Sequence, residues 1–230
     1  MNFSLSPFCF KKVILVLCLL GAVAFLIRMS FLADAPVRAA VVQAEGANWN
    51  HSSQKALVGF ISHYGDWPEL MLLGGIGFLI AGWRHNRKWQ RIFLIAMMAS
   101  TLAGALTNTL RLTTGRTRPR VSPAMEQGWY GPYYQGKWMV GRAEVNSFPS
   151  GHTATAVGFA TVIFLASPCW GVLALLMAVF IACSRLLLGA HHPSDLIVAT
   201  FLAMNVAWLI WSYFERNRSV NGVNLRKFNR

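Results

Sequence analysis

The chain has 230 residues, of which 55% are hydrophobic and only 13% charged, and it carries a formal net charge of +13. With its positive mean hydropathy, this composition excludes an ordinary soluble globular domain and predicts one integral membrane domain. The basic residues cluster beside apolar runs, so the charge indicates membrane topology and not nucleic-acid binding. The four cysteines form no Cys-x-x-Cys pair and have no spacing suited to a metal ion, so we expect inert packing residues.

The first apolar run covers residues 13–32, the length needed to cross a bilayer. A cleaved signal peptide is the alternative, because residues 33–35 (Ala-Asp-Ala) resemble a small-x-small cleavage site. Pro36, directly after that site, argues against cleavage. We therefore expect a retained helix, with the guanidinium of Arg28 reaching the far interface.

The mixed, polar segment 33–66 contains a helical repeat near its end. Leu57, Phe60, Ile61 and Tyr64 follow the spacing i, i+3, i+4, i+7, which places them on one helix face. This pattern predicts an amphipathic helix lying on the membrane surface.

Five further apolar runs complete a predicted all-α bundle of six transmembrane helices in a single domain. They cover residues 67–83, 92–110, 153–166, 170–188 and 195–211. Basic residues concentrate in the short loop 84–91 and in the tail after residue 211, which the positive-inside rule places in the cytoplasm. Both termini are then cytoplasmic, and the polar loop 111–148 lies on the periplasmic face.

Three short motifs flank these runs. They are Arg-Leu-Thr-Thr-Gly-Arg-Thr-Arg-Pro at 111–119, Pro-Ser-Gly-His at 149–152, and Ser-Arg-x5-His-x3-Asp at 184–195. In the predicted topology they follow span 3, open span 4, close span 5 and open span 6. All of them therefore fall at the outer face of the bundle.

The residue types in these motifs suit a phosphate group. Arginine binds phosphate oxygens with two parallel, charge-assisted hydrogen bonds, and the start of a helix at 150–152 adds free backbone N–H groups. Such positive charge on an outer loop runs against the positive-inside rule, and an anionic ligand explains it. His152 and His191 supply groups that can act as nucleophile or acid, while Asp195 read alone also suits a helix N-cap.

In this order, the three motifs resemble the type 2 phosphatidic acid phosphatase family of membrane lipid phosphatases, which is related to the vanadium haloperoxidases. The resemblance covers roughly residues 55–213, and it departs from the family at Arg111, where the family usually has lysine. It implies that His191 attacks phosphorus to give a phosphohistidine, that His152 protonates the leaving group, and that Asp195 accepts a hydrogen bond from His191. It further implies that the phosphate oxygens are held by Arg111, Arg118, Ser150, Gly151 and Arg185, without a metal ion or cofactor.

The motifs recognise a phosphate and not a lipid tail, so several substrates stay open. Undecaprenyl diphosphate is the leading prediction, beside the 1-phosphate of lipid A, phosphatidic acid and phosphatidylglycerophosphate. Another class is a non-catalytic anion- or lipid-binding membrane protein, although binding alone does not need the pairing of His191 with Asp195. A vanadate-dependent haloperoxidase is the third class, but those enzymes are soluble. We expect a multi-pass protein of a bacterial inner membrane, with lipid and bilayer as partners and an oligomeric state that the sequence leaves open.

Two groups of residues stay outside these assignments. His51, His63, His85 and His192 match no motif position and are predicted to be surface residues. The aromatic residues of segment 129–138 are either interfacial anchors or direct contacts to a lipid headgroup.

Overall fold

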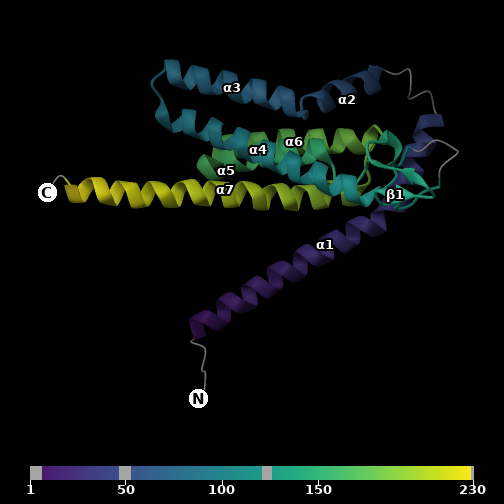
Figure 1. Cartoon of the computed structure of the whole chain (residues 1–230), viewed down its shortest axis with the longest axis horizontal. Helices are drawn as coiled ribbons and strands as arrows, with labels where there is room; N and C mark the ends of the chain where they lie inside the picture. Colours follow the sequence, from purple (N-terminus) through teal and green to yellow (C-terminus); the bar gives the residue numbers. More distant parts are fainter. Residues whose placement is uncertain (1–6, 47–52, 121–125, 229–230) are drawn as a thin grey trace.

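The computed structural model describes residues 7–46, 53–120 and 126–228, and within them the side chains of 16–43, 53–120 and 126–217. The chain is mainly helical (Figure 1). The helices are α1 (Pro7–Gly46), α2 (Ser53–His63), α3 (Trp67–Trp83), α4 (Arg87–Thr114), α5 (Gly151–Ala166), α6 (Pro168–Leu187) and α7 (Pro193–Phe228). Between α4 and α5 lie a hairpin of β1 (Tyr133–Tyr134) and β2 (Lys137–Trp138), in which Tyr133 pairs with Trp138, and the 3-10 helix η2 (Ala143–Val145).

Helix α5 is the centre of the bundle and packs against α4, α6 and α7. Small residues make these contacts close: a Cβ added to Gly158 would lie 3.2 Å from the Cβ of Ala103 and 3.2 Å from the carbonyl oxygen of Ala99. Ala199 and Ala203 of α7 join the same buried core. Lipid offers no hydrophobic drive for helix association, so membrane helices pack through interfaces of small residues that let their backbones approach closely.

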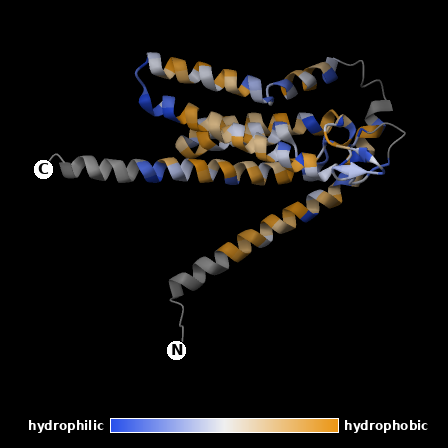
Figure 2. Ribbon diagram, in the orientation of Figure 1, coloured by the Kyte–Doolittle hydropathy of each residue, from blue (hydrophilic) through white to orange (hydrophobic). Residues whose placement is uncertain are grey.

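Four helical segments are long and apolar enough to cross a membrane within the described part of the chain: 16–43, 87–114, 168–187 and 193–217. Helices α3 and α5 are apolar but shorter, with 17 and 16 residues. Apolar side chains cover the outward faces of the helices (Figure 2), far more than a soluble monomer exposes. These features make the chain a membrane protein, and the crossing of all six predicted spans stays a prediction.

The six predicted spans lie within helices, except that α6 ends one residue before position 188. Two expectations change. Helix α1 runs through Pro36 to Gly46, so much of the segment expected to be mixed is helical. Helix α4 begins at Arg87, so the basic loop expected at 84–91 shrinks to a turn at 84–86. The repeat at 57–64 falls on α2 and the residue that follows it, as its spacing predicts.

The expectation for the cysteines is wrong in part. Cys18, Cys169 and Cys183 are free, but they are exposed on the outer faces of the helices and are not packed inside the bundle. In a membrane chain an outward face meets lipid, which accepts a thiol as readily as a protein core does. Cys9 lies outside the described side chains.

The chain reversals bring four helix ends together. The C-termini of α4 and α6 and the N-termini of α5 and α7 lie at one end of the bundle, beside the β1–β2 hairpin and the middle of α1 (Figure 1). The three sequence motifs therefore meet at this end. The opposite end carries the turn at 84–86 and the basic start of α4, which Figure 2 shows as hydrophilic.

Candidate active site

His191 lies in the turn between α6 and α7 and is 2% exposed. Its Nδ1 is 2.7 Å from the carbonyl oxygen of Ser147 and 3.5 Å from Oδ2 of Asp195. Both oxygens can only accept a hydrogen bond, so Nδ1 carries the ring proton. This leaves Nε2 with a free lone pair, which is the state a nucleophilic histidine needs.

The hydrogen bond that orients His191 goes first to the backbone of Ser147, and the carboxylate of Asp195 is a second, longer contact. Asp195 is fully buried and accepts hydrogen bonds from Ser147 Oγ at 2.5 Å, Arg116 Nη1 at 2.5 Å and the backbone N–H of His192 at 2.7 Å. Because α7 begins at Pro193, Asp195 is its third residue and not its N-cap. Its bond back to His192 N–H is the reciprocal half of a capping box.

Arg116 is a site residue that the sequence analysis left without a role. Its guanidinium is buried and bridges Asp195 to Asp34 of α1, and it also donates to Ser194 Oγ at 2.6 Å. Asp34 in turn accepts from the backbone N–H and the hydroxyl of Ser194, at 3.0 and 2.7 Å. Position 116 stands inside the first motif, which was a usable signal. Asp34, by contrast, lies in the sequence that resembled a cleavage site, and here that site is inside α1 and packed against the bundle.

Three aromatic rings surround this guanidinium. Arg116 lies 4.8 Å from the ring centre of Trp129, 5.4 Å from Phe31 and 5.8 Å from Phe148. Trp129 thus takes a role that neither interpretation of the aromatic segment foresaw, since it covers a buried cation. Tyr133 and Trp138 remain exposed on the hairpin, where their rings contact one another.

The arginines predicted to bind phosphate form a group of their own. Arg111, Arg118 and Arg185 come from α4, the segment after α4, and α6, yet they lie close enough to interact electrostatically. The Nε atoms of these three guanidiniums are buried, and none of them has a hydrogen-bond partner among the described residues. Unsatisfied buried donors of like charge are costly, and an anion with several acceptor oxygens would satisfy all three.

The start of α5 borders this group. Ser150 is the N-cap, and its hydroxyl accepts from the backbone N–H of Thr153 at 3.5 Å. The first-turn N–H groups of Gly151 and His152 are then the donors that the helix does not use itself. Glycine at position 151 lets the guanidinium of Arg111 approach this helix start, because an added Cβ would lie 2.5 Å from its Nη2 and displace it.

His152 also lies at this helix start, with its side chain partly exposed. Its Nε2 is 2.7 Å from Oδ1 of Asp66, in the turn between α2 and α3. Electrostatic interactions link His152 to His191 and to the three arginines of the site. Asp66 belongs to none of the three motifs, so no pattern in the sequence points to it.

The environment keeps His191 neutral. Burial lowers the pKa of His191 to about 4, helped by the positive charges of Arg185 and Arg118 and opposed by Asp195. Burial likewise lowers the pKa of Arg118, although the carboxylates of Asp195 and Glu144 oppose this effect. At neutral pH the site therefore combines a neutral imidazole with guanidinium charge.

One of the histidines predicted to lie on the surface does not. His192 is buried, its Nε2 lies 3.2 Å from the carbonyl oxygen of Thr117, and its backbone holds Asp195. Burial lowers its pKa, so it stays neutral and structural. His63 and His85 are exposed as predicted, and His51 lies outside the described residues.

Comparison with known proteins gives consistent matches. The family model described as PAP2 superfamily matches residues 90–219. A lipid A 1-phosphatase of Rhizobium etli is 33% identical over 95 residues, which make up 41% of this chain and 38% of that protein. A lipid A 1-phosphatase of Porphyromonas gingivalis is 27% identical over 146 residues, or 62% of this chain and 28% of that protein. The chain thus spans well under half the length of these relatives.

Among solved structures, Aquifex aeolicus LpxE is similar with a TM-score of 0.50 and 20% sequence identity. The similarity covers 72% of this chain and 90% of that chain. At this identity the likeness concerns the fold.

Proposed function

Because the chain belongs to the PAP2 superfamily, which confirms the family that its three motifs predict, we propose that it hydrolyses a membrane lipid phosphate through a phosphohistidine on His191. The observation that carries this proposal is the tautomer of His191. Its Nδ1–H is held by the carbonyl of Ser147, so the free lone pair of Nε2 belongs to a neutral, buried imidazole beside the three arginines.

The reaction proceeds in two balanced steps. Nε2 of His191 attacks phosphorus, the bond from phosphorus to the lipid oxygen breaks, and that oxygen takes a proton from His152. Water then attacks the phosphohistidine, its proton passes to His152, the P–N bond breaks, and inorganic phosphate leaves with both histidines restored. Arg111, Arg118 and Arg185 stabilise the charge on the phosphate oxygens in both steps, a task that needs no metal ion.

A lipid substrate is supported by an apolar groove beside the site. The groove has a volume of about 660 Å³ and runs between α2, α3 and α6, where Phe60, Ile61, Leu73 and Phe180 line it. It reaches the helices that flank the turn carrying Asp66, so a hydrocarbon chain could lie in the groove while its headgroup reaches the arginines.

For the headgroup, we propose the 1-phosphate of lipid A as the first substrate to test, since relatives from two organisms bear that name. Undecaprenyl diphosphate, the leading prediction from the sequence, stays a prediction beside phosphatidic acid and phosphatidylglycerophosphate. The test is phosphate release by the detergent-purified chain from each of these four lipids. Release from none of them, with binding retained, would favour the non-catalytic alternative.

We also propose that the site faces the periplasm of an inner membrane and that both termini are cytoplasmic. The support is the basic end of the bundle at residues 84–91, opposite the motifs. Single cysteines placed at positions 87 and 135, in a chain without its four native cysteines, test this with an impermeant thiol reagent on intact cells. Labelling at 135 alone is expected, and labelling at 87 alone would reverse the orientation.

A further inference from the structure

The turn between α2 and α3 is fixed against the two helices that carry His152 and Arg185. Thr155 Oγ1 of α5 donates to the carbonyl oxygen of Gly65 at 2.7 Å, and Arg185 Nη1 donates to Ser62 Oγ at 2.6 Å. Gly65 approaches α6 so closely that an added Cβ would lie 2.2 Å from the side chain of Ile181. The bundle itself therefore sets the position of Asp66.

The charges around His152 give this contact a purpose. Burial disfavours a positive imidazolium at His152, and so do the guanidinium charges that face it from α6, α4 and the segment after α4: Arg185, Arg111 and Arg118. His191, from the α6–α7 turn, also faces His152 but is neutral at neutral pH. A general acid must nevertheless carry a proton when the leaving group departs. The carboxylate of Asp66, 2.7 Å from Nε2, is the opposing charge in direct contact with the ring.

We propose that Asp66 is a positioning residue for this reaction: it accepts the Nε2–H of His152, stabilises the imidazolium and leaves Nδ1–H as the proton that the departing oxygen receives. The proposal rests on the proposed phosphatase function. The protons balance, because Nδ1 gives its proton to the leaving oxygen and regains one from the attacking water. The other proton stays on Nε2 throughout, hydrogen-bonded to the carboxylate of Asp66. The arrangement follows the logic by which a carboxylate orients a catalytic histidine.

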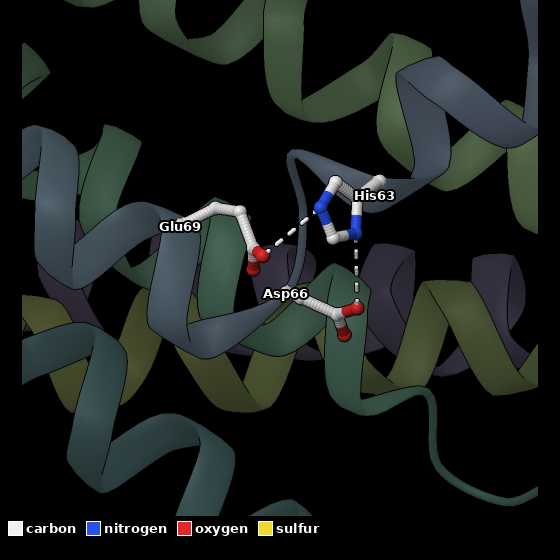
Figure 3. Close-up of side chains that lie close together, drawn as sticks. All are labelled: His63, Asp66 and Glu69. Carbon is white, nitrogen blue, oxygen red and sulfur yellow. Dashed lines mark ion pairs between the residues drawn. The ribbon is translucent and has the colours of Figure 1, made fainter.

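The surroundings of Asp66 agree with this role. Burial and the carboxylate of Glu69 raise the pKa of Asp66, opposed by Arg185 and His63, and a more basic carboxylate is a better partner for an N–H donor. His63 lies between the two acids, with Nδ1 3.9 Å from Asp66 Oδ2 and Nε2 3.1 Å from Glu69 Oε1 (Figure 3).

These three side chains also lie close enough together to be considered as a cation site. However, the ring of His63 turns one nitrogen to Asp66 and the other to Glu69 (Figure 3), and a single ion can take only one of them. The geometry therefore favours a histidine set between the two carboxylates, in close contact with Glu69 and more distant from Asp66, over a metal centre.

The experiment compares Asp66→Asn with the control His85→Gln, at an exposed histidine on the opposite end of the bundle, in the full, detergent-purified chain. Asparagine keeps a hydrogen-bond acceptor of the same size but loses the charge. We expect Asp66→Asn to lower kcat on an alkyl phosphate lipid by about 10-fold to 10²-fold, and to change turnover of an aryl phosphate with a good leaving group less than about 3-fold. The basic limb of the pH–rate profile for the alkyl substrate should move to lower pH. Asp66→Glu should restore part of the rate, and His85→Gln should behave as wild type.

Several outcomes would overturn this inference. Equal losses of Asp66→Asn on alkyl and aryl substrates would show that Asp66 has a merely structural role. A faster Asp66→Asn enzyme would show that the carboxylate competes with substrate for His152. A cation site would be assigned if EDTA removed the wild-type activity, if Zn²⁺ or Mg²⁺ restored it, and if the same ions failed to restore it in His63→Gln. NMR titration of His152 in ring-labelled protein gives a readout that needs no turnover: its protonation should shift to lower pH in Asp66→Asn. An unchanged titration overturns the inference even where the phosphatase activity stands, whereas a wild type that releases no phosphate overturns only the proposed function.

Discussion

The two histidines of the site are held in opposite ways. His191 is buried, its Nδ1 is fixed by a backbone carbonyl, and the carboxylate behind it is tied to Ser147, Arg116 and the start of α7. His152 is partly exposed, and its ring contacts one carboxylate that comes from a turn between two outer helices. The first arrangement resists both movement and protonation, while the second leaves the ring open to substrate and to solvent.

This difference matches what the two steps of a phosphoryl transfer demand. An attacking nitrogen must be neutral and aligned before the substrate arrives, so a rigid and desolvated setting helps it. A proton donor must exchange its proton in every turnover, so it needs a partner whose charge supports the imidazolium and access to water. Each prediction below perturbs one side of this pair and leaves the other in place.

Replacing His191 with alanine should have the largest effect. Without the nucleophile there is no covalent intermediate, so we expect turnover to fall by about 10⁴-fold or more on every substrate. Rapid-quench trapping of acid-labile phosphoenzyme measures the step directly. If the variant still forms the phosphoenzyme, the assignment of His191 is wrong.

Replacing His152 with alanine should discriminate between substrates. Alkyl phosphates need a proton on the leaving oxygen, so their hydrolysis should fall by about 10²-fold to 10⁴-fold. Aryl phosphates with an acidic phenol depart without that proton and should lose much less. Parallel rate measurements on both classes, with phosphoenzyme trapping, provide the check, and equal losses would contradict the division of roles.

Arg116→Ala should act mainly on stability. The change removes the guanidinium that pairs with both Asp34 and Asp195 and leaves the two carboxylates buried without a counter-charge. We expect this to cost about 3–5 kcal/mol of unfolding free energy. Thermal or denaturant unfolding in detergent measures this loss. The control is Arg84→Ala at an exposed turn position, expected to change stability by at most about 0.5 kcal/mol. Similar values for the two variants would show that the buried network contributes nothing.

The smallest expected effect is a displaced acid limb in the pH profile. The folded pKa of His191 lies at about 4, below the ordinary value of 6.5, so its neutral form persists as the pH falls below 6.5 and is lost only near 4. Phosphoenzyme formation from an aryl phosphate, corrected for the ionisation of the substrate, should therefore decline near pH 4. A decline centred near pH 6.5 would mean that His191 is as exposed to water as an ordinary histidine.

From the amino-acid sequence alone came the family, the helical membrane character and the end of the bundle at which the motif residues meet. Apolar length and basic clusters are local properties, and together they place the residues of all three motifs at one end of the helices. The departure of Arg111 from the usual lysine keeps the charge, but the sequence left its geometry open, and only the structure shows that Gly151 leaves room for the larger guanidinium.

Only the tertiary structure decided which single residues support the two histidines. Asp34, Asp66 and Ser147 stand outside the three motifs, and each becomes a partner because helix packing carries it to a motif residue far away in the chain. Arg116 and His192 lie within or beside motifs, yet only burial shows that both are structural and not surface groups. Periodicity and charge counts describe the average polarity of each face of a segment. A hydrogen bond depends instead on the position of one side chain to within a fraction of an ångström. That position is set by the close contacts of glycine and alanine between helices, which a single sequence does not reveal.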